Sequence, residues 1–390
     1  MAKYLDTLKK NAMLIILVLV YIFFTVGTKG AMFSPLNFNA LITQNAYVFI
    51  LATGMLMCML TGGNIDLSCG SFVCFMGAVG GILMVVKELP AGASIALMLL
   101  VGIIYGSILG FLVAYVNIPP WIATLAGYLA FRGWGTALLS ANSTTGSISL
   151  ANSKSFLKIF SGKLFETPIN QFNTVCFVIG IIASVIVVVT IFMGRMNKVK
   201  KGYEAESMVS VIVKSVLSVA AIMLFAYKLA KAGGLPVVLV WVVAIVLIYS
   251  FITAKTNLGR YFYTIGGNKE ATRLSGVDTR LIMFFAYLNM AVLTVITSYI
   301  VIARFQAANA TAGNYYEMDA IAACVVGGVS AYGGSGSVFG MVIGATLIGV
   351  INLGMQLMGV DADWQKIVKG GVLLGAVVFD ILATKKNATK

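Results

Sequence analysis

The stretch Thr-Gly-Gly-Asn-Ile-Asp-Leu-Ser-Cys-Gly-Ser, residues 61–71, separates two long apolar runs at 40–60 and 70–86. A helix needs about 20 mostly apolar residues to cross a membrane, because no water is present there to satisfy free backbone amides. Polar, glycine-rich backbone between two such runs must be buried in protein or face a water-filled path. The stretch therefore predicts a helical membrane protein with an irregular break between two of its helices.

Similar apolar runs continue in both directions from this break. Twelve candidate spans lie near 12–28, 40–60, 70–86, 92–116, 119–139, 172–193, 207–228, 234–253, 281–303, 316–330, 335–357 and 364–382. The expected fold class is all-α, a polytopic helical membrane protein with about 10–12 transmembrane helices. Two runs are the weakest, since 119–139 opens with Pro119-Pro120 and 316–330 is short and leads into glycines. Either of them fits a broken or re-entrant helix.

The composition supports a membrane protein and argues against other classes. Of the 390 residues, 60% are hydrophobic and 10% are charged, and the mean hydropathy is +0.98, which excludes a soluble core. Histidine is absent, so the commonest general acid–base group is missing and independent enzymatic activity is not expected. The five cysteines lie in or beside apolar runs and indicate packing residues, neither a disulfide framework nor a metal site.

The positions of the basic residues predict the topology. The 27 basic and 13 acidic residues give a net charge of +14, but the basic residues lie between apolar runs and form no nucleic-acid-binding face. Lysine and arginine favour cytoplasmic loops. With a cytoplasmic N-terminus, the clusters at 195–201 and 255–280 fall inside, and so do the C-terminal lysines Lys385, Lys386 and Lys390. The loop 140–171, which contains lysines, falls outside and disagrees with this rule.

The loop 254–280 combines glycines with a charged stretch typical of a short helix. Asn268 is a good N-cap after Gly266-Gly267, Glu270 lies in the first turn, where the helix dipole favours an acid, and Gly276 can end the helix in a left-handed conformation. We expect a helix over 268–275 that lies parallel to the membrane and docks a soluble partner. The alternative is a solvated loop whose basic residues only fix the topology.

Asp66 is the carboxylate at the centre of the first glycine break, and two roles are open for it. Ionisable groups near the membrane interior are costly and usually serve a pathway, a partner or a turn. Asp66 can equally accept hydrogen bonds from the amides that open the next helix. The later stretch 327–337 repeats a glycine pair followed by Gly-Ser, which suggests an internal duplication with a path between the repeats. Close helix packing at the glycines explains the same pattern.

Other polar residues are scattered through the apolar runs: Asn45, Thr124, Arg132, Asn289, Asn352, Gln356, Lys369 and Asp380. A proton-coupled carrier needs a relay of buried acids or histidines, so this scatter weakens the interpretation as an ion-coupled secondary carrier. The sequence has no carbonyl selectivity filter of the kind that ion channels use. It also lacks a Gly-x-x-x-x-Gly-Lys-Ser/Thr phosphate loop, so any nucleotide hydrolysis must come from another chain.

Long motifs follow one another in order along nearly the whole chain. Besides residues 61–71, they are Ile-Pro-Pro-Trp-Ile-Ala-Thr-Leu (118–125) with Phe131-Arg132-Gly133, Gly-Arg-Tyr-Phe-Tyr-Thr-Ile-Gly-Gly-Asn-Lys-Glu-Ala-Thr-Arg-Leu-Ser-Gly-Val (259–277), Glu-Met-Asp-Ala-Ile-Ala-Ala (317–323), Gly327-Gly328, Gly-Gly-Ser-Gly-Ser-Val-Phe-Gly (333–340) and Ala-Val-Val-Phe-Asp (376–380). Together they resemble the permease subunit of bacterial monosaccharide ABC importers, in the ribose, galactose and xylose branch.

The resemblance implies a fold similar to that of the vitamin B12 importer's permease, located in the bacterial cytoplasmic membrane. It implies a second permease copy, an ATPase subunit that holds ATP and Mg²⁺, and an extracellular or periplasmic sugar-binding protein, with no cofactor on this chain. The sequence departs from the family pattern Gly-Gly-Ile-Asp-Leu-Ser by an inserted Asn64. Residues 195–253 add a basic loop and a helical pair, as in the longer xylose and multiple-monosaccharide permeases, which favours xylose, arabinose or galactose as the substrate.

The chain 1–390 is accordingly expected to form one transmembrane permease domain. Its first half is 1–194 with the break 61–71, followed by the insertion 195–253, the cytoplasmic coupling loop 254–280, and the second half 281–390 with the break 327–337. The residues expected to contact the ATPase are Gly266, Gly267, Asn268, Lys269, Glu270, Ala271, Arg273, Leu274, Ser275 and Gly276. Those expected in the translocation path or its hinges are Gly62, Gly63, Asn64, Asp66, Ser68, Gly70, Thr124, Arg132, Gly327, Gly328, Gly333 and Gly334.

Overall fold

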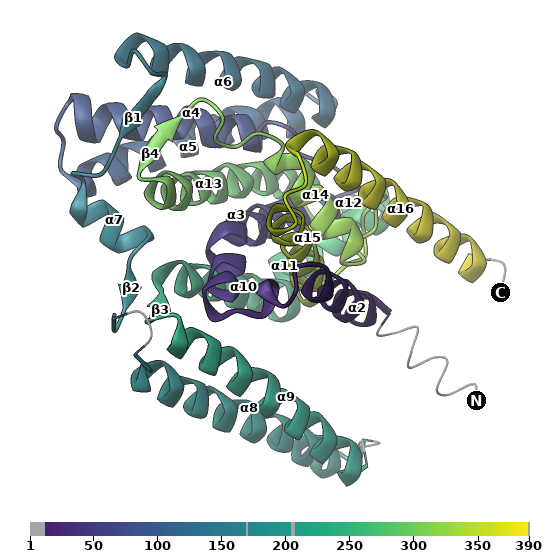
Figure 1. The fold of residues 1–390 in the computed structure, drawn as a ribbon. Coiled ribbons are helices and arrows are strands. Elements are labelled where there is room, and N and C mark those ends of the chain that lie inside the picture. The colour runs from purple at the N-terminus through teal and green to yellow at the C-terminus, as the bar shows by residue number, and fades with distance from the viewer. Residues whose placement is uncertain (1–11, 169–170, 204–206, 389–390) are drawn as a thin grey trace.

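The computed structural model describes residues 12–168, 171–203 and 207–388, which form an almost entirely helical bundle (Figure 1). Predictions about the first residues of the chain and about Lys390 lie outside these described ranges. Eight of the described helices are long and apolar enough to cross a membrane. The predicted all-α, polytopic membrane fold is confirmed.

Each predicted span coincides with a helix. These helices are α2 (Ala12–Gly27), α3 (Pro35–Leu60), α4 (Cys69–Gly81), α5 (Ala91–Ala114), α6 (Pro120–Asn142), α8 (Thr174–Lys200), α9 (Met208–Lys231), α10 (Val237–Lys255), α13 (Thr279–Phe305), α14 (Tyr316–Val326), α15 (Val338–Leu357) and α16 (Ala362–Ala388). The shorter helices are η1 (Ala31–Phe33), the π-helical turn η2 (Ile82–Val86) that extends α4, α7 (Lys154–Phe160), α11 (Asn257–Gly267) and α12 (Lys269–Leu274).

The two weakest predicted spans turn out differently. α6 runs unbroken for 23 residues and has Pro120 in its first turn, where a helix needs no amide donor and tolerates proline. The interpretation of 119–139 as a broken helix is therefore wrong. α14 has only 11 residues, a length of about 16 Å at 1.5 Å per residue, and cannot cross a membrane alone. The short α14 fits the interpretation of 316–330 as a broken or re-entrant helix.

α3 lies at the centre of the bundle. In its most apolar window 78% of the residues are buried, whereas the matching windows of α8, α9 and α10 are 17%, 11% and 17% buried. The apolar faces of these outer helices are suited to lipid as their solvent. α13 packs along α5 so closely that a Cβ on Gly106 would lie 2.9 Å from the Cα of Leu288. All five cysteines are buried and free, as expected for packing residues.

α8 and α9 form an antiparallel hairpin beside the main bundle (Figure 1). The sequence predicts a helical pair within 195–253, but α9 packs mainly against α8, which begins earlier, while α10 packs on α3. The hairpin is attached to the bundle at Lys228, whose Nζ donates a hydrogen bond of 2.6 Å to the carbonyl of Phe33. The rings of Phe38 and Phe225 add an edge-to-face contact at 5.2 Å.

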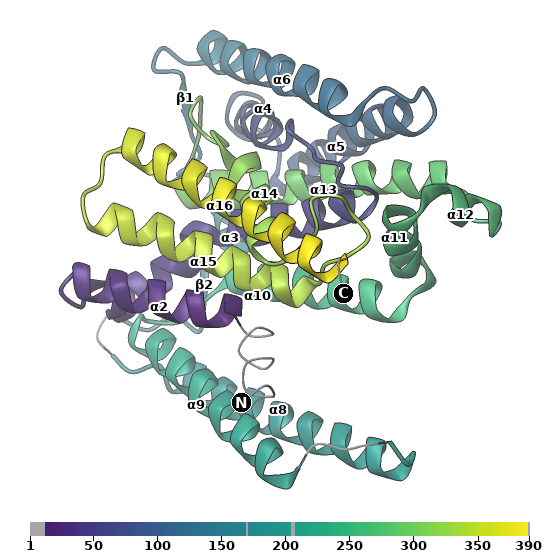
Figure 2. The same cartoon turned by 90° about the vertical axis from the view of Figure 1, so that its right-hand side faces the viewer.

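Short antiparallel ribbons connect loops at one end of the bundle. β1 (Ser147–Ser149) pairs with β4 (Ala307–Asn309), and β2 (Lys163–Leu164) pairs with β3 (Leu235–Pro236). β1 and the loop that joins α15 to α16 lie at this end, and α11 and α12 lie at the other (Figure 2). The loops 140–171 and 254–280 are thus at opposite ends of the bundle, which is the separation that the predicted topology requires.

Candidate functional site

Three glycine-rich segments meet where α3 and α11 end. The amide of Gly334 donates a hydrogen bond of 3.1 Å to the carbonyl of Leu60, the last residue of α3. The hydroxyl of Tyr263 in α11 donates one of 3.0 Å to the carbonyl of Gly336. A Cβ on Gly266 would lie 1.9 Å from the oxygen of Leu60 and 2.3 Å from the nitrogen of Gly334. We call residues 60–63, 266–267 and 331–336 the glycine clasp.

The two glycine breaks contact each other within this clasp. Gly63, at φ +74°, would place a Cβ 2.0 Å from the carbonyl oxygen of Ala331, and Gly333, at φ +89°, would place one 2.5 Å from the Cα of Gly62. Both conformations and both approaches exclude a side chain. The two similar glycine motifs are therefore in direct backbone contact, which neither motif alone predicts.

α12 is the short helix predicted for the loop. The Asn268 side chain caps it by accepting a hydrogen bond of 2.9 Å from the amide of Ala271, and Gly276 follows its end at φ +88°. Glu270 and Arg273 form an ion pair of 2.6 Å whose side chains are about two-thirds exposed, at 64% and 65%. Leu274 is 78% exposed. α12 is thus a capped helix with charged and apolar side chains exposed on its surface.

α11 is an amphipathic helix that the sequence analysis did not identify. Thr256 caps it by accepting a hydrogen bond of 3.1 Å from the amide of Gly259, and its buried residues include Phe262 and Ile265. Their helical spacing is the signal that predicts such a helix. A groove of about 600 Å³ lies between α11 and α12, with Arg260 and Thr264 on one wall and Thr272 on the other.

Asp66 organises the turn that leads into α4. Its Oδ1 accepts hydrogen bonds from the amide of Ser68 at 2.8 Å and from the hydroxyl of Ser68 at 2.6 Å. The hydroxyl of Tyr105 in α5 donates a further hydrogen bond of 2.6 Å to the Ser68 hydroxyl. Asp66 is 1% exposed. The carboxylate is thus engaged with Ser68, the residue that directly precedes α4.

Arg132 connects α6 to the turns between β4 and α14. Its Nη1 donates hydrogen bonds to the carbonyls of Ala310 and Ala312, at 3.3 and 2.9 Å. Arg132 Nε and Nη2 and the Oε2 atom of Glu317 are buried without a hydrogen-bond partner among the described residues. Glu317 lies against α4, because a Cβ on Gly70 would be 2.0 Å from its Oε2. Buried polar atoms of this kind are suited to bridging water.

The remaining predicted path residues make local contacts. Thr124 is buried and donates a hydrogen bond of 2.8 Å to the carbonyl of Pro120 within its own helix. The Nδ2 of Asn64 donates one of 3.2 Å to the carbonyl of Thr61. Gly327 approaches α15, where its Cβ would lie 2.4 Å from the oxygen of Gly340, and a Cβ on Gly328 would meet nothing within 4 Å. Among the described residues, the Thr124 hydroxyl thus makes hydrogen bonds only within its own helix.

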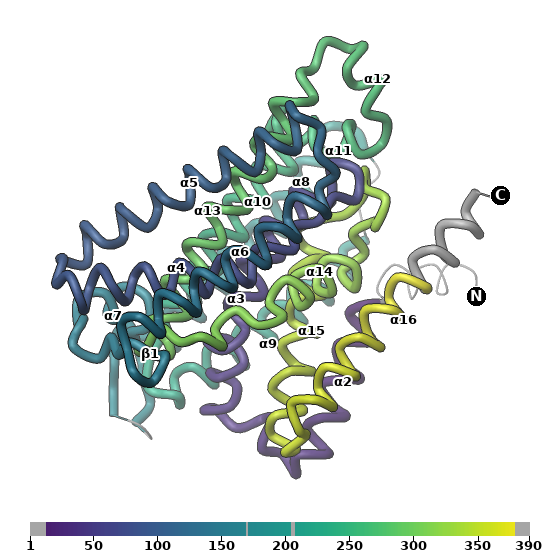
Figure 3. Tube along the Cα trace, turned by 90° about the horizontal axis from the view of Figure 1, so that it is seen from above, coloured from purple at the N-terminus to yellow at the C-terminus, as the bar shows by residue number. Residues whose placement is uncertain are grey.

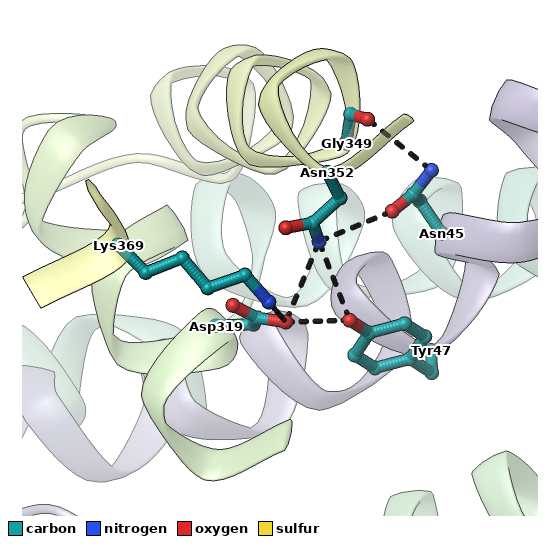
Figure 4. A network of polar contacts seen from close by, with 6 residues as sticks. All are labelled: Asn45, Tyr47, Asp319, Gly349, Asn352 and Lys369. Carbon is teal, nitrogen blue, oxygen red and sulfur yellow. Dashed lines mark hydrogen bonds and ion pairs between the residues drawn. The ribbon is translucent and has the colours of Figure 1, made fainter. Parts of the chain in front are cut away.

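A buried network of polar side chains joins α3, α14, α15 and α16 around Asp319 (Figure 4). Lys369 Nζ lies 3.0 Å from Asp319 Oδ2, and the hydroxyl of Tyr47 donates a hydrogen bond of 2.5 Å to the same oxygen. Asn352 Nδ2 lies 3.4 Å from this oxygen, from the Tyr47 hydroxyl and from Asn45 Oδ1. The ring of Tyr47 also stacks on Tyr316 with centroids 3.7 Å apart.

The network corrects one expectation from the sequence. Asn45, Asn352 and Lys369 were expected to be scattered, but the packing of α3, α15 and α16 gathers them around Asp319. Sequence reasoning assigned no role to Asp319, Glu317 or Tyr47. A lysine inside an apolar run needs a counter-charge. Lys369 therefore predicts a nearby carboxylate, which the structure shows to be Asp319.

A cavity of about 690 Å³ lies beside the network, between α14 and α16. Its polar lining residues are Thr311, Asn314, Asp319, Gln365, Lys366 and Lys369. Tyr315 adds an aromatic ring, and Met318, Ile348 and Leu373 add apolar surface. α16 and α14 lie alongside each other when the bundle is seen from above (Figure 3). The cavity thus combines a few hydrogen-bonding groups with a mainly apolar wall, as small-molecule sites usually do.

Known proteins resemble this chain over almost its whole length. Residues 37–377 match the family described as branched-chain amino acid transport system / permease component. The chain is 35% identical to the xylose transport system permease protein XylH of Haemophilus influenzae, over 96% of each chain. It is 33% identical to XylH of Escherichia coli, over 96% of this chain and 92% of that one. It is 31% identical to the ribose import permease protein RbsC of Escherichia coli, over 96% and 94%. No solved structure matches the chain.

Proposed function

The chain belongs to the family of branched-chain amino acid transport system permease components and is a permease component of a sugar ABC import system; we propose that it moves a monosaccharide of the xylose, galactose, arabinose or ribose class inward across the bacterial cytoplasmic membrane. Relatives named for xylose and ribose uptake support this substrate class. The proposed assembly contains two copies of this chain, an ATPase that holds ATP and Mg²⁺, and an external sugar-binding protein. The chain itself requires no cofactor and no nucleic acid.

The observation that carries the coupling role is the attachment of α12 to the glycine clasp. α12 directly follows α11, whose last residues touch both Leu60 and Gly334. A displacement of α12 by an ATPase would therefore reach the end of α3 and the segment before α15 through backbone contacts. The Tyr263 side chain adds one further contact, through its hydrogen bond to the carbonyl of Gly336. We assign the ATPase contacts to residues 266–276, in which Glu270, Arg273 and Leu274 have exposed side chains.

The path is assigned to the segments around the two glycine breaks. Gly62, Gly63, Gly333 and Gly334 form the hinge, and the turn at Asp66 and Ser68 orients α4. Irregular backbone at membrane depth is tolerated where it is buried or lines a water-filled cavity. A ligand shifts a two-state protein only as far as its affinities for the two states differ. A permease that binds its sugar weakly therefore leaves the choice of state to the ATPase.

The orientation places α11 and α12 in the cytoplasm with both termini. The basic clusters at 195–201 and 255–280 support it, because positive residues favour the cytoplasmic side. β1, β4 and the loop between α15 and α16 then face outward, where the binding protein would deliver the sugar. The loop 140–171 remains on the outer side in this arrangement, in spite of its lysines.

The deciding experiment is uptake of labelled monosaccharides into vesicles that contain this chain, its ATPase and its binding protein. We expect ATP-dependent uptake of one sugar of the proposed class, and we expect omission of any one component to abolish it. A vesicle that contains only this chain tests the second candidate, an ion-coupled carrier of a small polar solute. Uptake by the chain alone that collapses with an uncoupler would overturn the ABC assignment.

A further inference from the structure

The cavity between α14 and α16 has the chemistry of a site for an uncharged ligand. Lys369 and Lys366 both reach it, yet each already has a counter-charge, at 3.0 Å from Asp319 and 2.7 Å from Asp363. An anion would find no unpaired cation there, and a cation would find Asp319 already engaged by Lys369. The lining therefore favours a neutral ligand that can both donate and accept hydrogen bonds.

Three polar groups of the cavity keep hydrogen-bonding capacity. The Lys369 ammonium has three donors, and its side chain is 24% exposed although its partner Asp319 is 3% exposed. Gln365 uses its Nε2 to donate 2.8 Å to the carbonyl of Val360, which leaves its side-chain oxygen to accept. Asn314 is exposed and also lines the cavity. Donors and acceptors thus stand on both walls of the cavity.

Tyr315 supplies a flat apolar surface at the same place. It adopts a left-handed conformation at φ 63°, which is rare for a bulky residue, and its side chain is 46% exposed. Lys366 Nζ lies 5.5 Å from the ring centroid. A sugar has an apolar C–H face and a polar rim of hydroxyls. The Tyr315 ring matches the apolar face, and the hydrogen-bonding groups beside it match the polar rim.

We propose that this cavity is a low-affinity binding site for a monosaccharide within the permease, at the end of the bundle opposite α12. The sugar ring packs on Tyr315, and its hydroxyls exchange hydrogen bonds with Asn314, Gln365 and Lys369. The cavity of about 690 Å³ falls within the usual range of ligand pockets, about 300–1,000 Å³, and exceeds a monosaccharide, so water remains and binding is weak. The inference rests on the proposed function and names where that substrate first contacts this chain.

Thiol labelling of the complete importer in nanodiscs without ATP tests this site directly. The five native cysteines are buried, so introduced cysteines report on the cavity. In Gln365→Cys and Asn314→Cys, a polar maleimide should react more slowly when the transported sugar is added. For a dissociation constant near 1 mM, sugar at about 10 mM should slow labelling by about tenfold. Trp364→Cys is the matched control, since Trp364 precedes Gln365 on α16, is 62% exposed and lies outside the lining; its labelling should not change.

Uptake by the wild-type importer separates the two possible failures. If the wild-type importer takes up no sugar with ATP, the proposed function itself is wrong. If it takes up a sugar that protects neither Gln365→Cys nor Asn314→Cys, the function stands and the binding site is wrong. Equal slowing at Trp364→Cys would also overturn the site, because it would show a general effect of sugar on labelling. Either cysteine variant alone suffices if the other fails to assemble.

Discussion

The amide of Gly334 donates a hydrogen bond of 3.1 Å to the carbonyl of Leu60, and this bond joins the glycine break before α15 to the end of α3. The same carbonyl lies where a side chain of Gly266 would be, at the end of α11. Backbone atoms of all three segments are therefore in direct contact at this point. This is the physical basis for placing the coupling of α12 to the membrane helices at the glycine clasp.

Gly266→Ala tests this arrangement. The added Cβ would lie 1.9 Å from the Leu60 oxygen and 2.3 Å from the Gly334 nitrogen, so backbone must shift, which typically costs about 1–3 kcal/mol. We expect a lower melting temperature of the purified chain and loss of sugar-stimulated ATPase activity in the assembled importer. Gly133→Ala in α6 is the matched control, because a Cβ there meets nothing within 4 Å and the residue lies outside both the clasp and the ATPase contacts. Equal effects of the two variants would contradict the clasp as a coupling contact.

The exposed pair on α12 tests the docking surface. Replacing both Glu270 and Arg273 by alanine should reduce co-purification of the ATPase at least about tenfold, because a few side chains dominate most interfaces. The stability of the chain should change little, since an exposed ion pair contributes about 0–1 kcal/mol. Asp363→Ala removes a partner of a similar exposed pair at the other end of the bundle and should leave ATPase association unchanged. Normal assembly and transport of the double variant would refute the assignment of α12 to the ATPase contact.

Local features of the fold could be predicted from the sequence because their causes are neighbours along the chain. Asn268 caps α12 through the amide of Ala271, and Gly276 ends it, so all the residues that define this helix lie in one short stretch of the chain. Apolar run length likewise predicts where membrane helices lie. The sequence predicts α11 less clearly, because its apolar residues interleave with glycine, arginine and tyrosine.

Contacts between distant segments could not be predicted in this way. Tyr47 and Asp319 are 272 positions apart, and the pattern of neither residue names the other. The glycine breaks 61–71 and 327–337 are similar in sequence, yet this similarity does not predict that they touch. Asn45, Asn352 and Lys369 are polar residues in separate apolar runs, and only the packing of α3, α15 and α16 brings them to one carboxylate.

The Lys369–Asp319 pair predicts a non-additive pattern of stability. Lys369→Met leaves Asp319 buried, at 3% exposure, without its cation, and breaking a buried pair from one side costs about 3–5 kcal/mol. Adding Asp319→Asn removes the stranded charge while keeping an acceptor for the Tyr47 hydroxyl, so the double variant should recover most of the loss. Denaturant unfolding in detergent measures the cycle. Lys366→Met, on the exposed pair, is the control and should leave the stability nearly unchanged. Additive losses at Asp319 and Lys369 would show that the pair is not coupled.

Asp66 can be tested for its two possible roles with a pair of substitutions. Asn keeps an oxygen that can accept the amide and hydroxyl of Ser68, whereas Ala removes both hydrogen bonds, at 2.8 and 2.6 Å. If the carboxylate only fixes the turn into α4, Asp66→Asn should retain uptake and thermal stability. Asp66→Ala should then lose about 1–3 kcal/mol, the usual effect of leaving buried partners unsatisfied, and much of the uptake. The measurements are the melting temperature and ATP-driven uptake in the complete importer. The opposite pattern, in which Asp66→Asn is as stable as the wild type but does not transport, would mean that the negative charge itself acts in the path, because Asn changes the charge and little else.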